Sequence, residues 1–145
     1  MIRDMKEIYK EEYEEYITDG QFFSCYNYQP MIESFADEIL VQVDDSSYQG
    51  DTRVLLKEGN KIGHLIFGWG SCLGCDALQA CENIGQVQEL ANNLYSDIIW
   101  FDSEQEALDY FNNHDWEGDY CWHQEETHKY ITECKKYLQK VFDKR

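Results

Sequence analysis

The spacing of apolar side chains divides the chain into helices and strands. Over most of its length, apolar residues recur every three or four positions, which is the period of an amphipathic helix. The only proline, Pro30, fits the first turn of a short helix, where its missing N–H group costs little. The predicted helices are 2–17, 30–36, 84–95, 102–113 and 123–142, with one or two helical turns at 76–81.

Between the early and late helices the pattern changes to short runs rich in Ile, Leu and Val. These runs predict strands at 38–43, 53–57 and 62–69, and Gly59-Asn60 is a good hairpin connection because both residues accept a positive φ. A further short apolar run at 97–101 predicts a later strand. We therefore expect an α+β fold, in which a small antiparallel three-stranded meander (about 38–69) and a short later strand pack against four or five helices. A single domain, residues 1–145, is the economical interpretation.

A glycine-rich stretch that carries Cys72-Leu73-Gly74-Cys75 joins the third strand to the helical half of the chain. A Cys-x-x-Cys between a strand and a helix is typical of thioredoxin-like redox enzymes, in which the helix lowers the pKa of one thiol. Hairpins precede this motif, however, and no proline follows it. The context of a thioredoxin-like site is therefore missing, and redox catalysis is not the favoured interpretation.

The same cysteines suit two other interpretations. Cys72, Cys75 and Cys81 would supply three soft ligands to zinc, although a fourth ligand is not evident. The simpler interpretation is a tight structural turn in which the cysteines are buried as small hydrophobic residues. A second group follows later in the sequence: Cys121, His123, His128 and Cys134. Because Cys134 falls on the apolar stripe of the last helix, we expect it to be a core thiol.

The net charge limits the possible functions more than any motif does. Twenty-nine acidic residues face twelve Lys and Arg, so the formal net charge is −17. Such a field repels nucleic acids and anionic lipids, which argues against direct DNA or RNA binding and against membrane binding. It favours approach to basic protein surfaces, including those of proteins that handle nucleic acids. The alternative is that the charge only keeps the protein soluble.

The candidate partner-binding residues are acidic side chains of the first helix and of the hairpin region. The alternative is an ordinary solvated surface, which is common where like charges gather. The candidates are Glu7, Glu11, Glu12, Glu14 and Glu15 in the helix, and Asp44, Asp45 and Asp51 in the hairpin region.

The apolar runs, the cysteines and the lack of a catalytic pattern bear on the class of protein and on its location in the cell. No apolar run approaches the roughly 20 residues that span a membrane, and the first residues lack the apolar segment of a signal peptide. We expect a cytoplasmic protein whose six cysteines are thiols, ligands or core residues rather than disulfides. No pair of carboxylates and no neighbouring nucleophile and histidine stand out, so a non-enzymatic protein is predicted.

One stretch resembles a known group of proteins. Gly68-Trp69-Gly70-Ser71-Cys72-Leu73-Gly74-Cys75-Asp76-Ala77-Leu78-Gln79-Ala80-Cys81 is similar to a motif of small bacteriophage and prophage proteins without an assigned activity. Trp100-Phe101-Asp102-Ser103 and His114-Asp115-Trp116-Glu117-Gly118-Asp119-Tyr120 fit the same resemblance, which covers about residues 38–130.

The resemblance implies a phage accessory protein in the bacterial host cytosol. By analogy with other small acidic phage proteins, it implies binding and inhibition of a host nuclease or defence enzyme, in some cases by DNA mimicry. The predicted function is therefore a non-enzymatic acidic inhibitor that needs no cofactor. The alternative is a small zinc- or thiol-dependent protein that uses Cys72 and Cys75.

Overall fold

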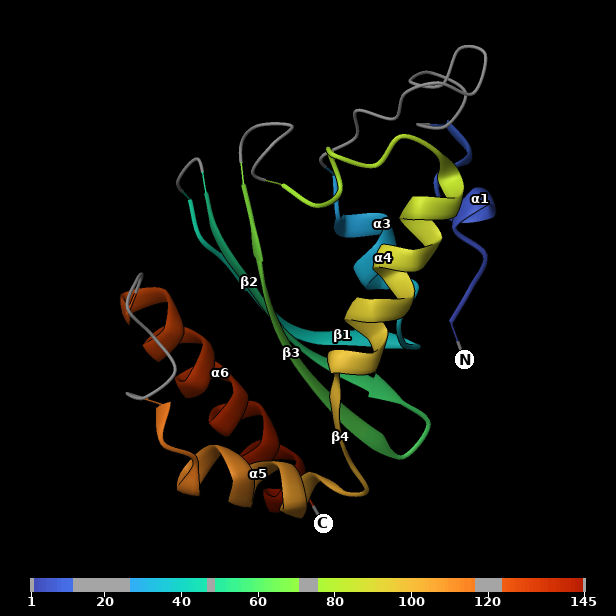
Figure 1. Cartoon of the computed structure of the whole chain (residues 1–145). Coiled ribbons are helices and arrows are strands. Elements are labelled where there is room, and N and C mark those ends of the chain that lie inside the picture. The colour runs from blue at the N-terminus through green and yellow to red at the C-terminus, as the bar shows by residue number, and fades with distance from the viewer. Residues whose placement is uncertain (1, 12–26, 47–48, 71–75, 117–123, 145) are drawn as a thin grey trace. The chain divides into compact units, whose positions relative to one another are not determined.

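The computed structural model describes residues 2–11, 27–46, 49–70, 76–116 and 124–144 (Figure 1). Within these ranges the chain forms an antiparallel four-stranded sheet and five helices, with the strands in the order β1-β2-β3-β4. The strands are β1 (Glu38–Asp44), β2 (Gly50–Glu58), β3 (Lys61–Trp69) and β4 (Ile99–Phe101). The helices are α1 (Met5–Ile8), α3 (Gln29–Glu33), α4 (Ile84–Asp97), α5 (Glu104–Asn113) and α6 (Gln124–Asp143). The predicted α+β fold, a three-stranded meander followed by a later strand, is confirmed.

Internal contacts divide the chain into two compact units. The first unit comprises the residues up to Ala36 together with 69–97, and it contains α1, α3 and α4. The second comprises 37–68 and the residues from Ile98 onward, and it contains nearly all of the sheet together with α5 and α6. That the two units fold as a single domain stays a prediction.

In the first unit the three helices bury apolar side chains against one another. Met5 of α1 is fully buried, and its N–H group donates to Gln88 Oε1 of α4 at 2.7 Å. The Phe35 ring meets the Tyr95 ring edge to face at 5.9 Å. The predicted first helix, 2–17, is described only to residue 11, and α1 ends at Ile8. The core residues of this unit include Met5, Tyr9, Met31, Ile32, Phe35, Val87, Ala91 and Leu94.

In the second unit, glycines make two features of the sheet possible. Gly59 adopts φ +59° in the β2–β3 turn, as the sequence predicts, and its N–H group donates to Asp37 Oδ2 at 3.0 Å. On β3, Gly63 lies opposite Trp100 of β4. A Cβ atom at Gly63 would lie 2.8 Å from the Trp100 ring, so the missing side chain makes room for the indole.

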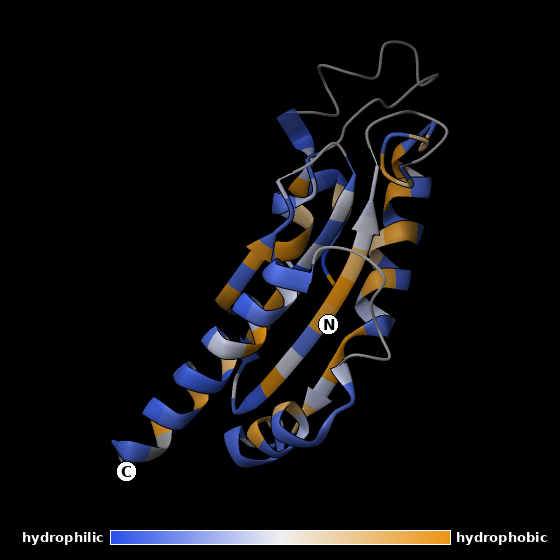
Figure 2. Cartoon of the chain, turned by 90° about the vertical axis from the view of Figure 1, so that its left-hand side faces the viewer, coloured by the Kyte–Doolittle hydropathy of each residue, from blue (hydrophilic) through white to orange (hydrophobic). Residues whose placement is uncertain are grey.

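One face of this sheet packs against α5 and α6. α6 contacts β1, β2 and α5, and apolar residues alternate with hydrophilic ones along the helix (Figure 2). A helix with this pattern buries one side and leaves the other in water. The buried cluster contains Val43, Leu55, Ile62, Phe101, Ala107, Leu108, Phe111, Tyr130, Ile131, Cys134 and Leu138. It confirms the predicted core position of Cys134 on α6.

Candidate functional site

The candidate acids of the first helix are described only in part. Glu7 and Glu11 are exposed, which suits the proposed binding role and also an ordinary helix surface. Glu12, Glu14 and Glu15 lie outside the described residues. Glu7 and Glu11 belong to the first unit, whereas the hairpin acids belong to the second.

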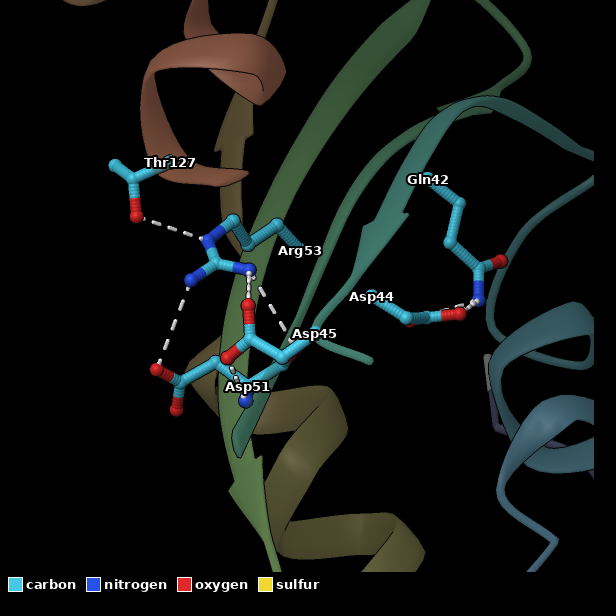
Figure 3. Close-up of polar contacts among 6 residues, drawn as sticks. All are labelled: Gln42, Asp44, Asp45, Asp51, Arg53 and Thr127. Atoms are coloured by element: carbon cyan, nitrogen blue, oxygen red, sulfur yellow. Dashed lines mark hydrogen bonds and ion pairs between the residues drawn. The ribbon is translucent and has the colours of Figure 1, made fainter. Parts of the chain in front are cut away.

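The three hairpin acids have different environments. Asp44 is exposed, and its carboxylate accepts from Gln42 Nε2 at 3.1 Å (Figure 3). The side chain of Asp45 is fully buried and forms an ion pair with Arg53, with 2.9 Å between Oδ1 and Nη1. The Asp51 side chain is 31% exposed, and its Oδ2 lies 3.8 Å from Arg53 Nη2. Only Asp44 of this group is therefore presented as an open surface charge, and Asp45 belongs to the interior.

Arg53 is the centre of this network. It lies on β2 with no exposed surface, and its Nε donates to Thr127 Oγ1 of α6 at 3.1 Å (Figure 3). Asp45 Oδ2 also accepts the N–H group of Asp51 at 2.7 Å, which closes the end of the β1–β2 hairpin. Because an unpaired buried guanidinium would be costly, these contacts stabilise the sheet and its packing against α6.

Gly50 makes this closed hairpin end possible. A Cβ atom at this position would lie 2.5 Å from Cβ of Asp45, so any side chain would displace the buried carboxylate. The sequence signal for this network is an arginine directly before the apolar run Val54-Leu55-Leu56, a signal that the predicted site residues did not include. Such an arginine requires an acidic partner when the strand is buried on both faces.

A histidine and a tyrosine form a second buried pair in the second unit. His64 Nδ1 lies 2.7 Å from the hydroxyl oxygen of Tyr130, whose O–H group donates to the carbonyl oxygen of Val54 at 2.7 Å. Since the tyrosine has one hydroxyl proton and directs it to Val54, His64 carries its proton on Nδ1 and donates it to Tyr130. The histidine ring is surrounded by the rings of Tyr110, Phe111, Trp116 and Tyr130. This arrangement orients a core histidine.

Asp76 holds together the two ends of the segment that contains the Cys-x-x-Cys. Its Oδ1 accepts from the N–H group of Gly70 at 3.1 Å and from the hydroxyl group of Tyr28 at 2.8 Å. Its Oδ2 accepts from the N–H group of Gln79 at 3.0 Å, and Gln79 Nε2 donates to the carbonyl oxygen of Gly70 at 3.2 Å. Burial, and then the Asp76 carboxylate, raise the pKa of the Tyr28 phenol. These contacts bring Gly70 close to Asp76 and Gln79. Residues 71–75 lie outside the described residues, so a structural turn there stays a prediction.

The three cysteines proposed as metal ligands are described incompletely. Cys81 is buried, and its thiol donates to the carbonyl oxygen of Ala77 at 3.3 Å. Cys72 and Cys75 lie outside the described residues, as do Cys121 and His123 of the second group. Where residues are described, no three His, Cys, Asp or Glu side chains form a group suited to a metal ion. The zinc site therefore stays a prediction.

Cys134 and His128 are the two described residues of the second group, and their environments do not suit a shared metal site. Burial raises the pKa of the Cys134 thiol well above its usual range, and the charge of Glu133 raises it further. The nearby Tyr130 hydroxyl acts in the opposite direction on the pKa of this thiol. His128, in contrast, is exposed. Cys134 is therefore protonated and protected in the core, which suits packing rather than metal binding.

Acidic charge also gathers in a part of the sequence outside the first helix and the hairpin region. No Lys or Arg lies between Lys61 and Lys129, a signal that the sequence already contains. In the second unit this stretch exposes Asp102, Glu106, Asp109, Asp115 and Glu125, and partly exposes Glu104 and Glu126. Along the sequence these acids therefore have no neighbouring Lys or Arg before Lys129.

Local structure explains why the acids are placed at the start of α5. Ser103 is the N-cap residue, and its side chain accepts the N–H group of Glu106 at 3.2 Å, while Glu106 accepts the N–H group of Asp102 at 2.9 Å. Acids in a first turn also favour the helix dipole. Burial, together with the negative charges of Glu38 and Glu104, raises the pKa of Tyr137. Acids from β1 and α5 thus act on the same partly buried tyrosine.

Within the described ranges, no helix has both the length and the apolar character needed to cross a membrane. Comparison of the chain with protein-family models, with curated proteins and with solved structures finds no match. The resemblance to bacteriophage and prophage proteins therefore stays a prediction.

Proposed function

We propose that the chain is a non-enzymatic binding protein whose acidic surface engages a basic face of a protein that handles nucleic acids. A bacterial nuclease or defence enzyme is the partner class that we favour, with inhibition by charge mimicry of DNA as the mode of action. The observation that carries the proposal is the net charge of −17, together with the stretch from Lys61 to Lys129 that lacks any intervening cation.

The proposal depends on the attraction between acidic and basic protein surfaces rather than on their shapes. DNA is a dense array of negative charge, so proteins that bind it present complementary basic surfaces. A strongly acidic protein is attracted to the same surfaces and is itself repelled by nucleic acid. Glu7, Glu11, Asp44 and the exposed acids of the second unit remain candidates for this contact, whereas the buried Asp45 does not. Cytoplasmic location and origin from a phage form part of the proposal.

Salt dependence is the first prediction of this proposal. The immobilised chain should retain a defined set of nucleic-acid-handling proteins from a bacterial lysate at low salt and release them at high salt. The reason is that the Debye length falls from about 8 Å at 0.15 M to about 3 Å at 1 M ionic strength. The measurement is quantitative mass spectrometry of the fractions eluted at each salt concentration.

A charge-depleted variant is the control for this experiment. Asp102→Asn, Asp109→Asn, Glu125→Gln and Glu133→Gln together remove four exposed negative charges without changing buried residues. The variant should lose partners at a lower salt concentration than the unmodified chain. Partners that stay bound at high salt, or the absence of any retained protein, would contradict the electrostatic proposal.

A zinc- or thiol-dependent function is the second candidate. The observation that favours it is the Asp76 contacts, which bring together the ends of the segment containing Cys72 and Cys75. If this function is correct, we expect stoichiometric zinc in the purified chain, or two thiols that react with Ellman's reagent before unfolding. Elemental analysis and thiol titration measure these quantities. No metal, with thiols that react only after unfolding, would exclude this function.

A further inference from the structure

The edge of the sheet beside α5 combines apolar and acidic side chains on one surface. Ile99 of β4 is 42% exposed and is the single large hydrophobic residue classed as exposed in the described part of the chain. Three partly exposed aromatic residues follow on α5 and the turn after it: Tyr110, His114 and Trp116. We call this set, Ile99, Tyr110, His114 and Trp116, the β4–α5 edge.

The register of the strands connects Ile99 to the aromatic residues. Ile99 lies directly opposite His64 in the antiparallel β3–β4 pair, so the two side chains project from the same face of the sheet. The His64 ring lies 5.8 Å from that of Tyr110 and 5.5 Å from that of Trp116. The exposed isoleucine therefore borders the aromatic cluster.

The aromatic rings of the edge pack directly against one another. The rings of Tyr110 and His114 stack at 4.8 Å, and the rings of His114 and Trp116 meet edge to face at 4.6 Å. Trp116 Nε1 donates to the carbonyl oxygen of Phe111 at 3.0 Å, which fixes the indole against the end of α5. Rigid aromatic side chains give contact area at little cost in conformational entropy, and they are enriched where proteins bind one another.

Exposed acids surround these apolar side chains. Asp102 follows β4, Glu106 lies one helical turn before Tyr110, and Asp109 precedes Tyr110 in the sequence. Asp115 lies between His114 and Trp116. Lys61 comes directly before Ile62, which lies opposite Phe101, so one cation lies at the Asp102 end of the edge. Residues 103–116 carry no Lys or Arg, so the rim is negative mainly along α5, while the centre is apolar and aromatic. This is the pattern of a protein-binding surface with an apolar centre and a polar rim.

We propose that the β4–α5 edge is the contact surface for a partner protein that presents arginine beside an apolar side chain. The inference rests on the proposed function and specifies which acidic surface is used and with what chemistry. Arginine fits because its planar cation stacks on aromatic faces and pairs with carboxylates. The apolar neighbour covers Ile99 and adds a hydrophobic component to a contact whose main attraction is electrostatic.

The test uses a short synthetic peptide in which arginine alternates with leucine, and a second peptide of equal charge in which serine replaces leucine. Titration calorimetry at low salt measures the affinity of each peptide for the full-length chain. Backbone amide chemical shifts then locate the contact. We expect the arginine–leucine peptide to bind more tightly, with shifts concentrated at Ile99 and at 109–116.

Two variants remove the two components of the proposed surface. Ile99→Ser should weaken binding of the arginine–leucine peptide about tenfold because it removes apolar contact area, whereas Ile99→Val should retain most of the affinity. Asp102→Asn with Asp109→Asn should weaken binding of the arginine–leucine peptide about threefold, because exposed ion pairs with the peptide are lost. The matched control, Glu125→Gln with Glu133→Gln, removes equal charge from α6. The control should leave the affinity within about twofold of the unmodified chain.

The outcomes separate this inference from the proposed function. Equal weakening by both charge pairs, or equal binding of both peptides, would overturn the β4–α5 edge as the contact surface while leaving electrostatic attraction intact. Concentration-dependent shifts of the same residues without peptide would instead assign the surface to a second copy of the chain. Failure of both peptides to bind at low salt would contradict the proposed function itself. If Ile99→Ser alters folding, the charge pairs and the shift map still decide the question.

Discussion

Replacing Asp45 by asparagine is expected to lower the free energy of unfolding by about 3 kcal/mol. The substitution keeps the shape of the side chain but removes the negative charge that lies 2.9 Å from Arg53 Nη1. Both side chains are fully buried, so the guanidinium would lose its principal counter-charge in a place that water does not reach. Asp51, which is more exposed and lies 3.8 Å from Nη2, replaces only part of that stabilisation. The measurement is the unfolding midpoint in urea.

The neighbouring acid supplies the control. Asp44→Asn removes an exposed charge and should change stability by less than about 0.5 kcal/mol. A double variant, Asp45→Asn with Arg53→Met, should be less destabilised than the sum of its single variants, because no unpaired charge remains buried. If Asp45→Asn is as mild as Asp44→Asn, the ion pair does not stabilise the fold as described.

Replacing Asp76 by alanine should also destabilise the chain by about 3 kcal/mol, here through unpaired hydrogen-bond donors. The carboxylate accepts from Gly70, Tyr28 and Gln79 in a site where Asp76 is 2% exposed. Alanine would leave these groups without an acceptor, and Gly70 would separate from residue 76. Urea unfolding gives the free energy, and hydrogen exchange at the Gly70 and Gln79 amides reports the local opening.

Tyr28→Phe tests how much of the stability lost in Asp76→Ala comes from the hydrogen bond with Tyr28. It removes one of the bonds to Asp76 and the hydroxyl oxygen that accepts the N–H group of Leu78, but it leaves the backbone contacts of the carboxylate. We expect a loss of about 1–2 kcal/mol, with little change in exchange at Gly70. Equal effects of the two substitutions would show that the contacts of the Asp76 carboxylate with the Gly70 and Gln79 amides add little stability of their own.

The networks of Asp45 and Asp76 show that acidic residues that look alike in the sequence have different structural roles. Asp44 and Asp45 are adjacent acids in a turn region, yet one is exposed and the other forms a buried ion pair. Asp76 looks like the start of a helical turn, but its carboxylate joins segments that lie far apart in the chain. Asp45 and Asp76 therefore support the fold, and neither is a surface charge.

Local sequence determined much of the architecture. Periodicity placed the strands of the meander and the helices α4, α5 and α6 because one buried face imposes a regular spacing of apolar residues. The Gly59 turn and the Ser103 cap followed from residue types that suit those backbone conformations. Composition alone determined the charge. These features depend on neighbours within a few residues, or on no neighbour at all.

Tertiary structure decided which polar residues are buried and which are presented to solvent. The hydrogen bond of Arg53 with Thr127, and that of His64 with Tyr130, depend on α6 packing against the sheet. The β4–α5 edge likewise exists because β4 returns to pair with β3 and places Ile99 opposite His64. Such contacts join residues distant in sequence, and the burial of one partner is set by the position of the other. Charge is a property of the sequence, but the distinction between an exposed and a buried charge belongs to the fold.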